Sequence, residues 1–316
     1  MEKLSPSEIF SGTSIFSWIK MGLSAAIAAV SIIVFAIVNA VCSHGDGSFN
    51  IIGLIIWLAL TCVIAIGVKT AVACKFRAAH VAVVVDAVNM GVIPEGQVSA
   101  GIETVTSRFG SASGYAAVEK GVQGSVMKIQ KTLNVYGERM LGVPVVSQLI
   151  KLSQNFVGWA LSFMSDCCMG YTFNDEQGVY RSATDAVTAY HQSWKNLYQN
   201  AVKLALIMMG CLVIAFLLVF FILVPVFSSA AGSAVYGLVV AAVITFILVK
   251  GFKNAVVDSY FMINTMERYF DEARYAMLDD EYYAPLYKLS KKYQSLYSRG
   301  KQDEARAAAA ENNAVM

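Results

Sequence analysis

The chain of 316 residues carries 24 basic and 22 acidic side chains, a formal net charge of +2, and is 57% hydrophobic but only 15% charged. About a quarter of the residues in a soluble domain are charged, so the composition excludes an ordinary soluble protein. The small net charge and the lack of a basic block argue against a nucleic-acid partner. The excess of apolar residues lies in four runs of roughly bilayer-spanning length, Met21–Cys42, Ile51–Ala73, Val202–Phe227 and Ala234–Val249. The sequence therefore predicts an all-α integral membrane protein with four main transmembrane helices.

The N-terminal segment, residues 1–20, is expected to be a cytoplasmic amphipathic stretch. It contains Glu2 and Glu8, and the apolar run after it is too long for the core of a cleaved signal peptide. We expect that run to begin a first transmembrane hairpin, 21–77, which a second hairpin, 201–263, matches in orientation. The loops inside both hairpins lack Lys and Arg, whereas basic residues flank the other helix ends. The positive-inside rule then places both termini in the cytoplasm of a protein of the cell membrane.

The region between the hairpins, 78–200, is predicted to be helical and to lie in the cytoplasm or at the interface. The VAVVV run at 81–85 follows the second span directly and is expected to continue its helix, with Pro94–Gly96 as a stop. Segments Ala100–Phe109 and Tyr115–Tyr136 carry apolar residues at helical spacing, which predicts amphipathic helices on the membrane face or on each other.

Residues 143–173 have an intermediate polarity. They are too polar for a lipid-facing span and too apolar for a solvated loop, so a membrane-embedded helix surrounded by protein is the prediction. The remaining segment, 264–316, is rich in charge and tyrosine and is expected to form a helical cytoplasmic tail.

The second and fourth spans can be aligned without a gap. Identical residues then coincide at Gly53/Gly237, Leu54/Leu238, Thr61/Thr245, Gly67/Gly251, Lys69/Lys253, Ala71/Ala255 and Val72/Val256. This pattern predicts an internal repeat of two hairpins about an axis near the membrane normal. Gly67 and Gly251 are expected where another helix approaches closely. Lys253 either reaches toward lipid headgroups or pairs with Asp258, which can also act as a gate at the inner mouth of a path.

Residues of about 144–295 resemble the C-terminal membrane half of the choline transporter-like family. The likeness rests on LSQNFVGWALSFMSDCCMGY at 152–171, on RSATDAVTAYHQSWKNLYQNAVKLALI, and on the last span with KGFKNAVVDSYFMINTMERYF. The residues at comparable places are Ser182, Ala183, Asp185, Ala186, Asn200, Val257 and Asp258. The extra N-terminal spans and the large outer loop of that family are absent from this sequence. The resemblance implies a transport domain for choline, ethanolamine or a related organic cation.

A quaternary ammonium ion is held by the faces of aromatic rings. Candidate substrate-binding residues along a path are therefore Trp159, Asp166, Tyr171, Thr61, Thr245 and Tyr260, because an intramembrane carboxylate also indicates function. Six scattered cysteines and three histidines show no metal-ligand spacing, and no enzyme motif or cofactor signature occurs.

Two functions follow from these patterns. One is a transporter or channel for a small solute, with its path between the hairpins and the 143–173 helix. The alternative is a non-transporting membrane scaffold whose cytoplasmic helices oligomerise or recruit partners. Four spans make a thin wall for a path, so a transporter of this size calls for a homo-oligomer or for insertion of the central helices.

Overall fold

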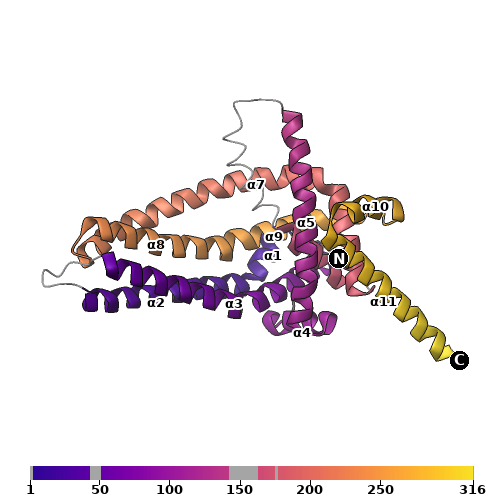
Figure 1. Ribbon diagram of the computed structural model, residues 1–316, viewed down its shortest axis with the longest axis horizontal. Coiled ribbons are helices and arrows are strands. Elements are labelled where there is room, and N and C mark those ends of the chain that lie inside the picture. Colours follow the sequence, from indigo (N-terminus) through magenta and orange to yellow (C-terminus); the bar gives the residue numbers. More distant parts are fainter. Residues whose placement is uncertain (1–2, 43–50, 142–162, 175–176, 316) are drawn as a thin grey trace. The chain divides into compact units, whose positions relative to one another are not determined.

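A computed structural model describes residues 3–42, 51–141, 163–174 and 177–315, and these form helices and no strand (Figure 1). The helices are α1 (Pro6–Gly12), α2 (Ser14–Cys42), α3 (Ile51–Met90), α4 (Gln97–Phe109), α5 (Ala112–Leu141), α7 (Val179–Ala230), α8 (Ala234–Phe252), the π-helical turn η2 (Lys253–Val257), α9 (Asp258–Ala273), α10 (Asp280–Leu289) and α11 (Lys291–Val315). Residues 163–174 are also helical. The predicted all-α class is confirmed for the described residues.

Four helical segments are long and apolar enough to cross a membrane: Ser14–Cys42, Ile51–Val68, Ile207–Ala230 and Ala234–Ala273. Each overlaps one of the predicted runs, although the bounds differ. The first begins seven residues before Met21, because Ser14–Lys20 already belong to α2. The third extends beyond Phe227 to Ala230, and Pro225 lies within α7.

The chain divides into two compact units. We call residues 14–77 and 206–259 the span unit, and residues 1–13, 78–205 and 260–316 the helical domain. Helices α3 and α7 run through both units. One part of each helix lies in the span unit and the other part in the helical domain.

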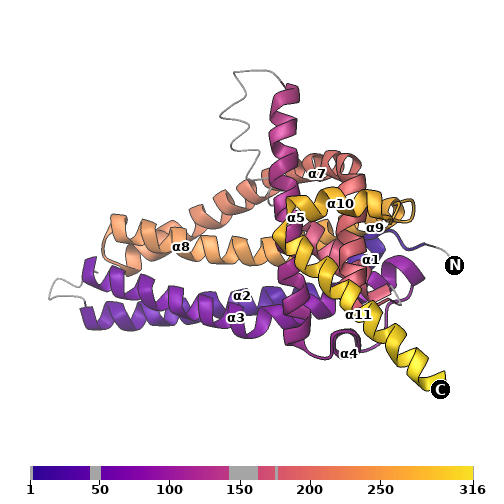
Figure 2. The same cartoon turned by 45° about the vertical axis from the view of Figure 1, so that its right-hand side comes forward.

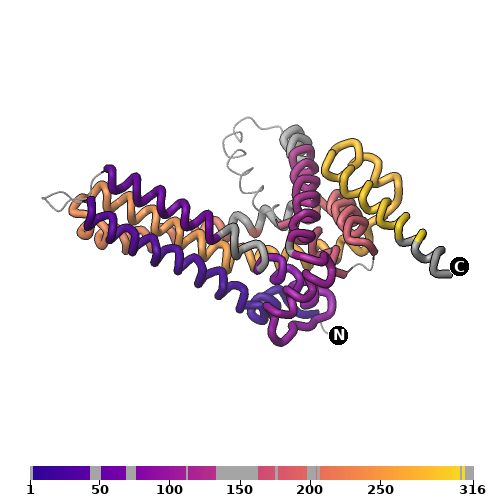
Figure 3. Tube along the Cα trace, turned by 60° about the horizontal axis from the view of Figure 1, so that its bottom comes forward, coloured from indigo at the N-terminus to yellow at the C-terminus, as the bar shows by residue number. Residues whose placement is uncertain are grey.

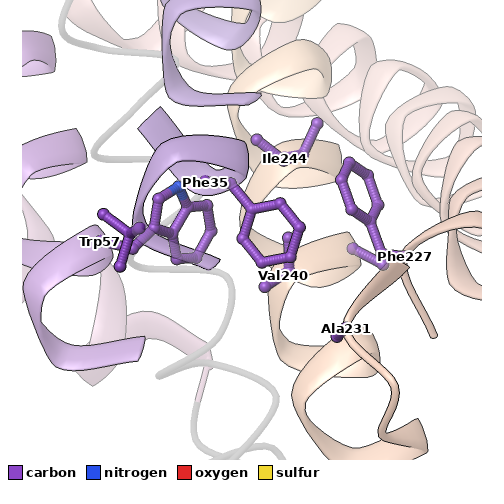
Figure 4. Close-up of a cluster of buried hydrophobic side chains, with 8 residues drawn as sticks. Phe35, Trp57, Phe227, Ala231, Val240 and Ile244 are labelled. Carbon is purple, nitrogen blue, oxygen red and sulfur yellow. The ribbon is translucent and has the colours of Figure 1, made fainter. Parts of the chain in front are cut away.

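Aromatic side chains fill the end of the span unit where α7 turns into α8. Helices α2, α3 and α8 run alongside one another there (Figures 2 and 3). Figure 4 shows the ring of Phe35 between Trp57 and Phe227, and the ring centroids lie 5.9 and 5.8 Å apart in edge-to-face geometry. The indole Nε1–H of Trp57 donates to the backbone carbonyl of Ser31 at 2.8 Å, so its polar atom is satisfied inside the unit. Aliphatic residues close the cluster, among them Val240 and Ile244 of α8.

The outer faces of the span unit are apolar and exposed. Ile55 of α3 is 60% exposed, and Leu218 and Phe221 of α7 are 63% and 70% exposed. At about 25 cal/mol per Å² of apolar surface, such faces are stable only when something other than water covers them. Lipid hydrocarbon does so without requiring a protein partner.

The predicted close approaches at the two aligned glycines have different outcomes. A Cβ atom at Gly251 would lie 2.3 Å from the Cβ atom of Ser24, so α2 and α8 are in close contact there. A Cβ atom at Gly67 would meet nothing within 4 Å, so the expectation of a close approach at Gly67 is wrong. Identical residues at aligned positions therefore have different surroundings. The repeat stays a prediction from sequence.

The helical domain has an aliphatic and aromatic core of its own. Residues 78–85 of α3 are all buried, which confirms that the VAVVV run continues the helix of the second span. Predicted helices around 100–109 and 115–136 are present as α4 and α5, with Val118, Val122 and Ile129 buried. These buried side chains make the two amphipathic helices part of a protein core.

The first part of the segment expected to form a tail, residues 264–296, packs within the helical domain. Residues 264–273 lie in α9, and α10 and the start of α11 pack against each other and α5. Each of these two helices has a pair of buried side chains, Tyr283 and Leu286 in α10 and Tyr293 and Leu296 in α11. The residues of each pair are three apart, so they lie on one face of their helix and hold it in place. The sequence did not reveal this apolar stripe, because charged residues are so frequent in the segment.

Replacing Gly251 by alanine should destabilise the protein by about 1–3 kcal/mol, because the added methyl group has no space beside Ser24. Gly67→Ala is the matched control, since the same methyl group at the aligned position meets open space. That variant should be unchanged or more stable, by up to about 1 kcal/mol, because alanine favours a helix over glycine. Thermal unfolding in detergent measures both, and equal effects of the two substitutions would contradict the described packing.

Candidate functional site

The predicted substrate and gate residues are divided between the two units. Trp159 lies outside the described residues. The helical domain contains Asp166, Tyr171 and Tyr260, and the span unit contains Thr61, Thr245, Lys253 and Asp258.

Lys253 and Asp258 form an ion pair at the end of α8. The ammonium group of Lys253 donates to both carboxylate oxygens of Asp258, at 2.7 and 2.9 Å. Residues five apart in an α-helix point about 140° away from each other. The π-helical turn η2, in which the backbone N–H of Asp258 donates to the carbonyl of Lys253, brings the two side chains to the same face.

The start of α2 contributes a second polar contact at this end of the span unit. Lys20 donates from its ammonium group to the hydroxyl of Ser259 at 2.9 Å, one residue after Asp258. Ser24, one turn further along α2, packs on Gly251. The lysines that sequence patterning placed at the inner membrane interface therefore make contacts within the protein, and the pairing of Lys253 with Asp258 is confirmed.

Thr61 and Thr245 are both buried in the span unit, at 3% and 0% exposure. Neither hydroxyl oxygen has a hydrogen-bond partner among the described residues. A buried hydroxyl without a partner costs about 1–3 kcal/mol. These two hydroxyls, together with Oδ1 of Asn39 on α2, are buried polar atoms of the span unit that a ligand or a water molecule would satisfy.

Asp166 lies in the helix over 163–174 and is 2% exposed. Other parts of the helical domain surround this helix: Phe163 stacks on Phe261 of α9, Gly170 faces Val85 of α3, and Phe173 packs on Phe109 of α4. The described part of the segment predicted to be membrane-embedded is therefore the central helix of the helical domain. Residues 143–162 of that prediction lie outside the described residues.

The remaining predicted aromatics take part in packing. Tyr171 is half-buried and lies edge-on to Tyr269, with ring centroids 6.4 Å apart, and Tyr260 lies edge-on to Phe10 at 5.9 Å. Beside Asp166, burial raises the pKa of the Cys167 and Cys168 thiols, so both are protonated at neutral pH and are poor nucleophiles.

The helical domain contains a charged network that was not predicted from the sequence. Arg181 and Asp185 are one turn apart on α7, with Nε of Arg181 3.3 Å from both carboxylate oxygens. The phenol of Tyr283 on α10 donates to Asp185 at 2.8 Å and accepts from Nη2 of Arg181 at 2.8 Å. Burial and the adjacent carboxylate raise the pKa of Tyr283, so the phenol stays protonated and holds α10 on α7. The spacing of Arg181 and Asp185 signals their pairing, but nothing in the sequence connects them to a tyrosine 98 residues away.

The helical domain also has a pocket of about 280 Å³ between α7 and the end of α9. Asn196 donates to Glu272 at 2.9 Å in its wall, and the amide of Gln192 exchanges two hydrogen bonds with the backbone of Met277. Tyr275 at the rim is 86% exposed. The described residues hold no group of three or more His, Cys, Asp or Glu side chains that could bind a metal ion.

Removing the Asp185 carboxylate should destabilise the helical domain strongly. Asp185→Ala leaves the largely buried guanidinium of Arg181 without its buried partner, at a cost of about 3 kcal/mol in the free energy of unfolding. Tyr283→Phe keeps the ring and removes only the hydroxyl, which should cost about 1 kcal/mol. Lys301→Gln, in an exposed pair with Glu304, should change stability by less than about 0.5 kcal/mol. Chemical denaturation followed by circular dichroism separates the three, and a neutral Asp185→Ala variant would refute the network.

A pH effect is expected at Asp86 of α3, because burial raises the pKa of this half-buried carboxyl above its ordinary value of 3.8. When the pKa of a carboxyl is raised in the folded state, the folded protein becomes less stable as the pH rises through that pKa. Asp86→Asn should therefore raise the melting temperature at pH 7, and the gain should shrink toward about pH 4. The exposed Glu103→Gln serves as control. A gain that is the same at both pH values would contradict this explanation.

Neither a protein-family model, nor a curated protein, nor a solved structure matches this chain. The resemblance to the choline transporter-like family therefore stays a prediction from sequence, and function has to be argued from the geometry.

Proposed function

We propose that the protein is an integral membrane protein whose four spans anchor a cytoplasmic helical domain, and that its function is to present this domain to a partner at the membrane. The observation that carries the proposal is the aromatic packing of Phe35, Trp57 and Phe227, which fills the end of the span unit where α7 turns into α8. A scaffold needs such a filled interior, whereas a transporter needs a path.

The side chains inside the span unit are poorly suited to a cation. A quaternary ammonium ion requires ring faces that are open to it. The ring of Phe35 is in contact with Trp57 and Phe227, and the indole N–H of Trp57 is committed to Ser31. The charges of Lys253 and Asp258 neutralise each other instead of pointing at a ligand.

The helical domain has features of a binding module. Its core holds a buried charged network and a central helix, so the domain is rigid enough to present a surface. The pocket beside Tyr275 offers mixed hydrogen-bonding groups on that surface. Basic residues at the ends of the spans, such as Lys20 and Lys250, favour a cytoplasmic position of this domain by the positive-inside rule.

Transport of a small organic cation is the second candidate. The observation that favours it is the pair of buried hydroxyls of Thr61 and Thr245, which occupy aligned positions and have no partner among the described residues. Polar groups of this kind can line a path that opens in a homo-oligomer.

Uptake into proteoliposomes distinguishes the two functions. We expect labelled choline and ethanolamine to enter vesicles containing the protein no faster than protein-free vesicles. Saturable uptake that falls at least about tenfold in Thr61→Val and Thr245→Val would overturn the scaffold proposal in favour of transport. Thr106→Val, on the exposed face of α4, is the matched control because it removes a hydroxyl from the helical domain.

A further inference from the structure

Five exposed lysines meet where α5, α10 and α11 come together. A Cβ atom at Gly121 of α5 would touch Leu296 of α11, and one at Gly124 would touch the side chain of Lys292. The two helices therefore run antiparallel, and the residues of α5 that follow Gly124 lie near the junction of α10 and α11 (Figure 2). We call the lysines at this place the lysine corner: Lys128 and Lys131 of α5, Lys288 of α10, and Lys291 and Lys292 of α11.

The positive charge of the lysine corner is not neutralised by nearby acids. None of its five ammonium groups makes an ion pair with a carboxylate in the described part of the chain. Along the three helices the nearest acidic residues are Glu138 of α5, Glu281 of α10 and Asp303 of α11. Each is separated from the corner by about 10 Å or more of helix rise. That distance equals or exceeds the screening length of about 8–10 Å in physiological salt.

The positions of Lys291 and Lys292 are unfavourable for folding. They occupy the first turn of α11, where the helix dipole favours negative charge, and this turn contains no acidic residue. Like charges on neighbouring turns repel each other as well. An external anion would relieve both costs, so the arrangement indicates an anionic partner.

We propose that the lysine corner binds the anionic surface of a lipid bilayer. This inference rests on the proposed function, in which the spans anchor the helical domain and the domain presents its surface to a partner. Lysine is a compact point charge, and clusters of basic residues next to membranes are attracted to anionic headgroups. No arginine fork for bidentate base contacts belongs to the corner, and the net charge of the whole chain is only +2, so a bilayer fits better than a nucleic acid.

The test uses the full chain in nanodiscs of phosphatidylcholine, mixed with vesicles that contain phosphatidylserine and recovered by flotation. We expect capture of the protein by these vesicles at an ionic strength of about 0.15 M and its loss at about 1 M. Replacing all five lysines of the corner by glutamine should lower capture at least about tenfold, because each contributes to attraction by the surface. Replacing all five by arginine should preserve it. The matched control removes five exposed basic charges elsewhere and should leave capture unchanged: Lys195, Arg268, Arg274, Lys301 and Arg306.

Several results would overturn the inference. Equal capture by vesicles of phosphatidylcholine alone, or by the glutamine variant, would show that the corner does not recognise anionic lipid. Stronger capture by an immobilised RNA or DNA duplex than by the vesicles would assign the corner to nucleic acid. A chain that stays outside the nanodisc would overturn the proposed function together with this inference, whereas an inserted chain that ignores phosphatidylserine overturns the inference alone.

Discussion

Apolar surface has to be covered, and the two units of this protein meet that constraint in opposite ways. Helix α3 shows it within one continuous element: Ile55 and Val63 are exposed in the segment over 51–68, whereas Val81, Val83 and Val85 are completely buried in the segment over 78–90. Protein covers the second segment. The first needs another apolar medium, because roughly 1.5–3 kcal/mol is at stake for each large aliphatic side chain. Helix α7 has the same division in reverse order, with buried residues 182–190 preceding an exposed apolar segment. This inversion supports our proposal that the span unit lies in a bilayer.

Polar contacts then set the positions of the helices, which apolar packing alone leaves adjustable. At the end of α8, a π-helical turn aligns Lys253 with Asp258, and Lys20 reaches Ser259 from α2, so these lysines have partners inside the protein. In the helical domain, Arg181, Asp185 and Tyr283 join α7 to α10. Both arrangements use charge to set helix position. Neither leaves its charged groups directed at a substrate, and this supports our proposal of an anchored binding domain over a transport path.

Local sequence patterns were sufficient for the helices but not for the long-range contacts. Length and hydropathy located the four apolar segments, and helical spacing of Val118, Val122 and Ile129 located α5, because both signals depend on neighbouring residues. The position of Asp166 could not be found in this way. Its helix is apolar enough to resemble a membrane segment, and only the folded chain shows that Phe261 and Val85 belong to its surroundings. The contact of Asp185 with Tyr283 and the different surroundings of Gly67 and Gly251 likewise depend on tertiary packing, to which an alignment of identical residues is blind.

The location of the exposed apolar faces is the point on which this account depends most directly. Spin labels at Ile55 and Leu218 of the span unit, and at Ile102 and Met127 of the helical domain, would be placed one at a time in a variant without the six native cysteines, reconstituted in nanodiscs. Relaxation by oxygen, which concentrates in hydrocarbon, is then compared with relaxation by a water-soluble nickel chelate. We predict that oxygen dominates at Ile55 and Leu218 and that the chelate dominates at Ile102 and Met127. Access of the chelate to Ile55 and Leu218 as free as to Ile102 would contradict it.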